Sequence, residues 1–387
     1  MTVSLSLEPG PQPAGRLRGI RRFLIGENPA VADLAWLVER SWIREPVERV
    51  VHVDLDYLYD PDPEQAERNL DRFLERILDL APSTVYLQAF ADPDGDGTAS
   101  ALYFPNRHLP MRADLFNRVA WQLETRIEVD VFAWLPVLGF ELPDSAANER
   151  LSVKRWGPGN AAPVPSRADY RRLSPWIPEA RRIIGDIYED LGKAAAIDGL
   201  VFHDDAYLSD AEDAAAYPDE PGRLPTAREK TLALIDFTDE LAARARQYRP
   251  RIETARNLYA EAALNPAAES WLAQNLELFL DRYDWTAVMA MPLLEGAADA
   301  DDWLDRLAGR IAAAPGGLSR TLFELQAVDW RSSEPVDPER LAAWMRRLER
   351  RGAIHFGYYP DDVHRDVPRL ATIRTAFSTR SRPWTGR

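Results

Sequence analysis

The chain has 387 residues, of which 46% are hydrophobic and 28% charged, and its formal net charge is −15. This balance is typical of a folded protein that buries a sizeable core, and it excludes a disordered chain. Because phosphate binding needs a basic surface, the scattered lysines and arginines argue against nucleic acid as a partner, while the negative charge favours a cationic ligand.

The sequence also argues against several classes of enzyme. It has no cysteine, and its five histidines form no H-x-x-x-H pair, so we expect no zinc site. The G-x-S-x-G, Walker and dinucleotide-binding glycine motifs are missing, which argues against serine hydrolases, NTPases and Rossmann enzymes. Residues 91–99, ADPDGDGTA, resemble a calcium loop only superficially, since the glutamate at the twelfth position is missing, and we expect a turn-rich loop there. We therefore predict neither a metal nor a cofactor.

The N-terminal stretch MTVSLSLEPGPQPAGRLRGI contains no apolar run of the kind that a signal peptide carries. No other segment approaches the roughly 18 apolar residues that a membrane helix requires. Two expectations remain open: a cytoplasmic protein, or a piece of a longer exported chain.

Short runs of β-branched and aromatic residues recur along the chain, and a longer stretch with helical periodicity follows each of them. This alternation is typical of βα units. The eight predicted strands are Val50–Asp56, Thr84–Phe90, Val129–Val137, Asp198–Asp205, Ile252–Asn257, Thr286–Pro292, Thr321–Gln326 and Ala353–Tyr359.

Amphipathic helices are predicted between the strands, for example over Pro63–Ala81 and Lys230–Tyr248. Eight alternations favour an α/β fold of the closed (β/α)₈ TIM-barrel type, with residues 46–387 as one domain and residues 1–45 as an N-terminal extension packed on it. The Pro- and Gly-rich stretches Trp156–Arg167 and Tyr217–Pro225 are predicted to be loop insertions at the C-terminal face of the barrel.

In such barrels the functional site lies where the strands end, and the first strand ends in polar residues. His52, Asp54 and Asp56 alternate with Val51, Val53 and Leu55, so the carboxylates are expected to point into the barrel or its mouth. A hydrogen-bonded network with a purely structural role is the alternative, because buried carboxylates must be paired.

The fourth strand ends in a denser cluster. The sequence FHDDAYLSDAED brings His203, Asp204, Asp205 and Asp210 within a dozen residues. Neighbouring strand residues face opposite ways, so Asp204 and Asp205 both point inward only if the strand has already turned. Glycosidic bond cleavage needs a protonated acid and usually a second carboxylate, which such a cluster provides. The alternatives are a solvated acidic loop or a helix N-terminus rich in aspartate.

Polar and aromatic residues recur after later strands and form the rest of the candidate site. They are Arg256, Asn257, Glu295, Glu324, Gln326, Tyr358, Tyr359, Asp361 and Asp362, with the aromatic residues Tyr57, Phe90, Trp134, Trp285 and Trp330. Sugar rings stack on aromatic planes through their C–H faces, and we expect two or three of these rings to face a ligand.

Several long strings resemble the C-terminal hydrolase domain of bifunctional poly-β-1,6-N-acetylglucosamine N-deacetylases, which process exopolysaccharide during export. They are VDLDYLYDPDP, LQAFADPDGDG, YFPNRHLPMRADLFNRVAWQL, FHDDAYLSD, TARN, YDWTAVMAMP, FELQ and FGYYPDD. The resemblance implies a periplasmic (β/α)₈ barrel whose acidic groove binds and internally cleaves partly deacetylated poly-N-acetylglucosamine. It also implies a deacetylase domain N-terminal to this one in the parent chain, together with outer-membrane export machinery.

Carried onto this sequence, the resemblance places the candidate catalytic carboxylates at Asp204, Asp205 and Asp210, with Asp210 as the first choice. The candidate substrate-binding residues are Asp54, Asp56, Tyr57, Trp134, His203, Glu295, Glu324, Tyr358 and Tyr359. Free glucosamine units carry ammonium groups that an acidic groove can hold by charged hydrogen bonds. A non-catalytic module that guides the polymer toward export is the alternative function.

Overall fold

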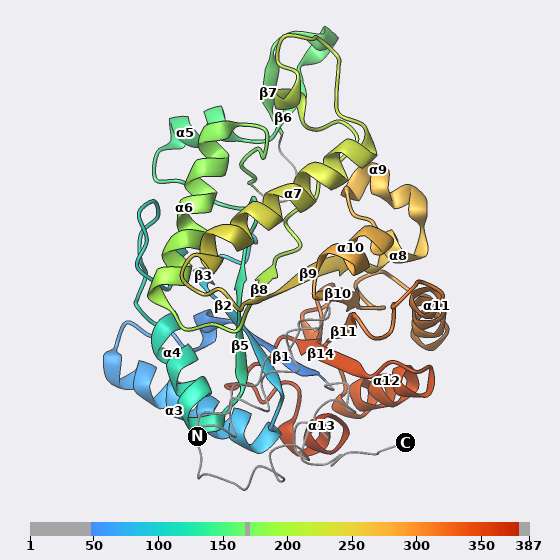
Figure 1. The fold of residues 1–387 in the computed structure, drawn as a ribbon. Coiled ribbons are helices and arrows are strands. Elements are labelled where there is room, and N and C mark those ends of the chain that lie inside the picture. The colour runs from blue at the N-terminus through green and yellow to red at the C-terminus, as the bar shows by residue number, and fades with distance from the viewer. Residues whose placement is uncertain (1–47, 167–170, 379–387) are drawn as a thin grey trace, which may run out of the picture. The chain divides into compact units, whose positions relative to one another are not determined.

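The computed structural model describes residues 48–166 and 171–378, and within them eight parallel strands close into a barrel (Figure 1). The strands pair with their neighbours in chain order, and the last pairs with the first. All eight predicted strands are confirmed within a few residues, and so is the TIM-barrel fold. They are β1 Arg49–Val53, β2 Thr84–Gln88, β5 Asp130–Leu135, β8 Gly199–Phe202, β9 Glu253–Tyr259, β10 Trp285–Ala290, β11 Thr321–Gln326 and β14 His355–Tyr359. The predicted extension, residues 1–45, lies outside the described residues.

Helices cover the outside of the barrel (Figure 1). The longer ones are α3 Pro63–Leu80, α4 Phe116–Gln122, α6 Pro178–Ala194, α7 Ala227–Arg246, α10 Leu276–Arg282, α11 Ala300–Ala312, α12 Pro338–Arg350 and α13 Leu370–Phe377. Shorter helical segments are α5 Ser145–Leu151, α8 Ala260–Leu264 and α9 Glu269–Leu272. Among the described residues, no helix is both long and apolar enough to cross a membrane.

Local sequence explains why α3 begins and ends where it does. Asp62 accepts a hydrogen bond from the backbone of Glu64 at the N-terminus, and Pro63 occupies the first helical position, where its missing N–H costs nothing. Ala81 ends the helix in a left-handed conformation. The buried residues Phe73 and Ile77 lie one turn apart on the face that packs against the barrel.

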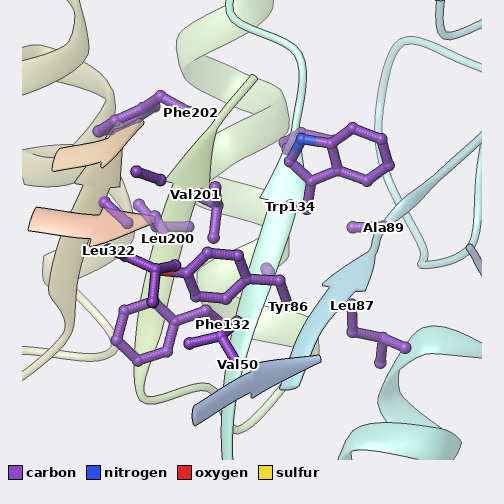
Figure 2. Close-up of a cluster of buried hydrophobic side chains, with 14 of the residues drawn as sticks. Val50, Tyr86, Leu87, Ala89, Phe132, Trp134, Leu200, Val201, Phe202 and Leu322 are labelled. Atoms are coloured by element: carbon purple, nitrogen blue, oxygen red, sulfur yellow. The ribbon is translucent and has the colours of Figure 1, made fainter. Parts of the chain in front are cut away.

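Apolar side chains fill the lower part of the barrel interior (Figure 2). Tyr86 and Phe132 stack with their ring centroids 5.5 Å apart, beside Val50 and Leu322. Gly199 makes room for this layer, since a Cβ there would meet the Phe132 ring at 2.4 Å. The barrel is therefore a packed core, and a ligand can enter only at its mouth.

The predicted loop Trp156–Arg167 contains a short antiparallel hairpin, made of β6 Lys154–Trp156 and β7 Pro163–Pro165. Figure 1 shows this hairpin projecting from one end of the barrel. The Trp156 indole donates a hydrogen bond of 2.8 Å to the carbonyl of Arg223, so the two predicted insertions are joined. The strand pairing was missed because both strands are only three residues long and the second, Pro-Val-Pro, is proline-rich, so neither carries a β-pattern.

Candidate active site

Aromatic rings converge on Trp134 at the C-terminal end of β5. Its ring centroid lies 4.2 Å from that of His52, 4.8 Å from His203, 5.1 Å from Phe90 and 5.6 Å from Tyr359. His52 lies on β1 and Tyr359 on β14, while Phe90 and His203 follow β2 and β8, so Trp134 lies across the barrel interior, above Tyr86 and Phe132 in Figure 2.

The aromatic cluster reaches the surface through one further ring. Trp330 stacks on Tyr359 with a centroid distance of 5.7 Å and an interplanar angle of 20°, and it is 38% exposed. A sugar ring can therefore stack on an exposed plane that continues into the mouth.

Asp54 follows β1 and borders this cluster. Its Oδ2 atom accepts a hydrogen bond of 3.3 Å from the Tyr359 hydroxyl, and Tyr57 also bonds its side chain. Burial raises the pKa of Asp54 to about 6, and the negative charge of Asp56 adds to this, although His52 and the two tyrosines act in the opposite direction. Asp54 thus changes its charge near neutral pH.

We expect this raised pKa to make folding stability depend on pH. Between pH 3.8 and about 6 the folded protein keeps the Asp54 proton, whereas the unfolded chain releases it. The free energy of unfolding therefore falls as the pH rises to about 6, and it stays lower above that pH. Asp54→Asn cannot ionise. Its free energy of unfolding relative to the unsubstituted protein should therefore rise by up to about 3 kcal/mol between about pH 4 and about pH 8, measured by urea unfolding.

Asp71→Asn is the matched control, because Asp71 is exposed on α3. It should show no such change. If both variants follow the same pH dependence, the environment described for Asp54 is wrong.

His52 belongs to a buried network of side-chain hydrogen bonds. Its Nδ1 atom lies 2.6 Å from Oε1 of Glu324, and Asn257 donates to Oε2 of Glu324 at 3.0 Å. A carboxylate oxygen accepts, so Nδ1 carries the proton of this contact. Both oxygens of Glu324 are thus occupied by protein groups. Glu324 therefore lies beneath the predicted binding groove and not in it.

Three buried polar atoms of this cluster have no hydrogen-bond partner within residues 48–166 and 171–378: Nε2 of His52, Oδ1 of Asp54 and Nε1 of Trp134. Leaving a buried polar atom unpaired costs about 1–3 kcal/mol. A ligand with hydroxyl or amide groups would satisfy these atoms, which is typical of a binding site.

Asp204 is the carboxylate of the fourth strand end that faces the cluster. Because β8 ends at Phe202, the chain has turned before Asp204 and Asp205. The Tyr259 hydroxyl donates to Oδ2 of Asp204 at 3.0 Å, and Nδ1 of His203 lies 3.1 Å from Oδ1. The charges of Asp204 and Asp54 contribute to raising the pKa of the buried Tyr359, so both carboxylates lie near that ring.

His203 is buried beside the same carboxylates. Burial alone would lower its pKa, but the negative charges of Asp204 and Asp205 outweigh burial and raise it. A positively charged imidazole is therefore favoured next to Asp204.

Asp205 has a different role. It is fully buried, and its oxygens accept hydrogen bonds from the backbone N–H groups of Val137, Leu138 and Gly139 at 3.0, 2.6 and 2.6 Å. These bonds tie the loop after β5 to the end of β8. The expectation that Asp205 takes part directly in catalysis stays a prediction and gains no support here, because its oxygens hold the main chain.

Asp56 is also a structural carboxylate. It accepts hydrogen bonds from the Tyr103 hydroxyl and Arg112, both at 2.6 Å, and from the backbone N–H of Asp92 at 2.9 Å. These contacts fasten the loop after β2 to β1. The prediction that Asp56 lines the groove gains no support, since its partners come from the protein.

Asp210 lies in the loop after β8 and is exposed. Two later acidic residues of the loop, Glu212 and Asp213, are buried. Burial raises the pKa of Asp213 to about 6, with a smaller contribution from Glu212. Asp210 is thus an exposed carboxylate of this loop that a ligand can reach.

The remaining predicted residues fall into two groups, those that are partly exposed and those that lie away from the mouth of the barrel. Tyr57 and Glu295 are partly exposed, and burial together with the charge of Glu261 raises the pKa of Glu295. Tyr358 is fully buried, bonds Asp361 and packs on Phe377 of α13, so it lies on the helix-facing side of β14 and outside the groove. Trp285 begins β10 and bonds Glu253, which places it at the closed end.

Sequence reasoning missed Tyr259 and did not select His52 as a site residue. Both could have been found from the two-residue period of their strands, since Tyr259 follows Asn257 and His52 precedes Asp54 on the inward face.

In the loop after β2, Asp92, Asp94 and Asp96 bring oxygen atoms within 4.8 Å of one another. Asp92 also accepts backbone hydrogen bonds from Asp96 and Gly97 at 3.0 and 2.9 Å, as in the expected turn-rich loop.

Comparisons with known proteins agree with this arrangement. Residues 52–359 match the model of hypothetical glycosyl hydrolase family 13. A poly-β-1,6-N-acetyl-D-glucosamine N-deacetylase of Escherichia coli K12 is 42% identical over 97% of this chain, which spans 58% of that relative's length.

Two solved structures extend the comparison. The PgaB (BpsB) glycoside hydrolase domain from Bordetella bronchiseptica is 48% identical, with a TM-score of 0.80 over 86% of this chain and 99% of that one. The α-L-fucosidase isoenzyme 2 of Paenibacillus thiaminolyticus, 14% identical with a TM-score of 0.56, covers 86% of this chain and 49% of its own and shares the fold alone. The chain therefore belongs to hypothetical glycosyl hydrolase family 13, as a glycoside hydrolase domain of the PgaB type.

Proposed function

We propose that this domain cleaves partly de-N-acetylated poly-β-1,6-N-acetylglucosamine at internal bonds. The observation that carries the proposal is Asp204, a partly exposed carboxyl group held by Tyr259 and His203 at the edge of the aromatic cluster. The polymer is suggested by the name of the E. coli relative and by the likeness to the PgaB hydrolase domain.

In this proposal Asp204 passes a proton to the oxygen of the leaving sugar, and it takes that proton from the charged imidazole of His203, whose Nδ1 atom lies 3.1 Å from Oδ1 of Asp204. Tyr259 and His203 orient its carboxyl group. Asp205 positions the end of β8, and Asp54, which accepts a hydrogen bond from Tyr359, is a second carboxyl group near that ring. The geometry thus moves the first choice of acid from Asp210 to Asp204.

One exposed and one partly exposed carboxylate supply the preference for deacetylated units. Asp210 and Glu295 can accept charged hydrogen bonds from glucosamine ammonium groups, and the net charge of −15 attracts a cationic polymer. A fully acetylated polymer lacks these ammonium groups and should be cleaved poorly.

The setting is also part of the proposal, and it rests on the resemblance of the sequence strings to the exopolysaccharide N-deacetylases. The domain would act in the periplasm, in a parent chain that carries a deacetylase domain and passes its product to outer-membrane export machinery.

The test is to incubate the protein with partly deacetylated and with fully acetylated polymer and to measure chain length by size-exclusion chromatography and mass spectrometry. We expect fragments of intermediate length from the first and little change in the second. Retained binding without any shortening would favour a non-catalytic binding module, and release of single sugars alone would contradict internal cleavage.

A further inference from the structure

Three neighbouring acidic residues in the middle of the loop that joins β8 to α7 lie in two different environments. Asp210 is exposed, whereas Glu212 and Asp213 are buried. One exposed carboxylate is therefore followed closely in the chain by two buried ones.

Glu212 fastens the loop to the β6–β7 insertion. Its Oε1 atom accepts a hydrogen bond of 2.8 Å from the buried Arg172 and a second from the hydroxyl of Ser166, and its Oε2 atom accepts the backbone N–H of Ser209 at 2.9 Å. Arg172 also donates to the carbonyl of Tyr207 and lies over that ring at 4.1 Å.

Asp213 adds a second attachment. It accepts the backbone N–H groups of Lys154 and Ala215, both at 3.1 Å, and the hydroxyl of Ser174. Both buried carboxylates thus bond to the segment from Lys154 to Ser174, which includes the hairpin in Figure 1.

Lys230 holds the loop from the opposite side. It lies in the first turn of α7 and is 1% exposed. Its Nζ atom donates to the carbonyl of Ser209 at 2.6 Å and to the carbonyl of Asp210 at 3.0 Å. Its ammonium group thus bonds the main chain at Asp210 directly.

A buried ammonium group is costly, and an apolar side chain would fill the same space without that cost. Burial lowers the pKa of Lys230, while the charges of Glu212, Asp210 and Asp213 oppose this. A buried lysine at this position is explained if the hydrogen bonds that fix the carbonyl groups of Ser209 and Asp210 have a function.

We propose that Lys230 is a positioning residue for Asp210: its ammonium group fixes the main chain of residues 209 and 210 so that the Asp210 carboxylate is presented to the substrate. This inference rests on the proposed function, in which Asp210 binds ammonium groups of the polymer. Lys230 itself touches no substrate.

The test compares Lys230→Met, Asp210→Asn and the double variant by cleavage of partly deacetylated polymer. We expect Lys230→Met to raise KM about 10- to 100-fold, with a smaller change in kcat, because a displaced binding group loses its contact. The double variant should be no worse than Asp210→Asn alone. Lys230→Arg, which keeps the charge and the donors, should recover part of the loss.

Lys193→Met is the matched control, because Lys193 is an exposed lysine on α6 that pairs with Glu189. It should leave KM unchanged. If the losses from Lys230→Met and Asp210→Asn instead multiply in the double variant, Lys230 acts on general stability and the inference fails.

A second readout separates this inference from the proposed function. Hydrogen exchange of residues 207–216 should be faster in Lys230→Met than in the unsubstituted protein and unchanged in Lys193→Met, whether or not the polymer is cleaved. Unchanged exchange would overturn the positioning role, while absent cleavage with faster exchange would overturn only the proposed reaction.

Discussion

Asp204→Asn should lower kcat for polymer cleavage by about 10²- to 10⁴-fold, the usual contribution of a general acid. The amide keeps the shape of the carboxyl group and can still accept from Tyr259, so the fold should survive. KM should change little, because the lost proton is needed in the transition state rather than for binding. Reducing ends released per unit time give kcat, and circular dichroism reports the fold.

Asp210→Asn and Asp219→Asn complete this experiment. Asp219→Asn, at an exposed site in the same β8–α7 connection, is the control for the loss of one surface charge and should keep full activity. Asp210→Asn should chiefly raise KM. Loss of kcat in Asp210→Asn with normal turnover by Asp204→Asn would reverse the two roles.

Arg76→Met should cost about 3–5 kcal/mol of folding stability, because it leaves a buried carboxylate without its partner. Arg76 of α3 forms two hydrogen bonds with Asp361, at 2.8 and 2.9 Å, and both side chains are buried. Arg76 also bonds Asp366 and the carbonyl of Pro368 at 2.6 and 2.7 Å. Helix α3 is thus joined to the segment that follows β14. Urea unfolding followed by circular dichroism measures the loss.

Glu67→Ala is the matched control on the same helix, since Glu67 pairs with Arg118 in an exposed ion pair. It should cost less than about 1 kcal/mol. Adding Asp361→Asn to Arg76→Met should recover part of the loss, because the unpaired charge is then removed. Equal costs for Arg76→Met and Glu67→Ala would show that this buried pair contributes no more than a surface one.

The strand ends explain which parts of the site could be predicted. Polar residues after β1 and β8 marked the mouth correctly, because parallel strands place their C-terminal ends at one face of a barrel. The inward period of two selects Trp134 and Tyr359 in the same way. Tyr358 was included together with its neighbour Tyr359. Adjacent strand residues face opposite sides, however, and Tyr358 packs on α13.

Local sequence could not separate the roles of the carboxylates. Asp204 and Asp205 are neighbours of identical type, yet one bonds Tyr259 near the mouth and the other bonds three backbone N–H groups of the β5 loop. The same holds for Asp54 and Asp56. A carboxylate's role depends on the donors around it, and those donors come from distant segments of the chain.

By itself, the sequence determined the barrel and predicted an acidic site at the C-terminal ends of its strands. These follow from periodicity and composition, which are local properties of the chain. Only the tertiary structure decided which carboxylates bond to other parts of the protein, as Asp56, Asp205 and Glu324 do, and which remain for a ligand. The physical reason is that burial and hydrogen-bond partners are set by contacts between residues up to hundreds of positions apart.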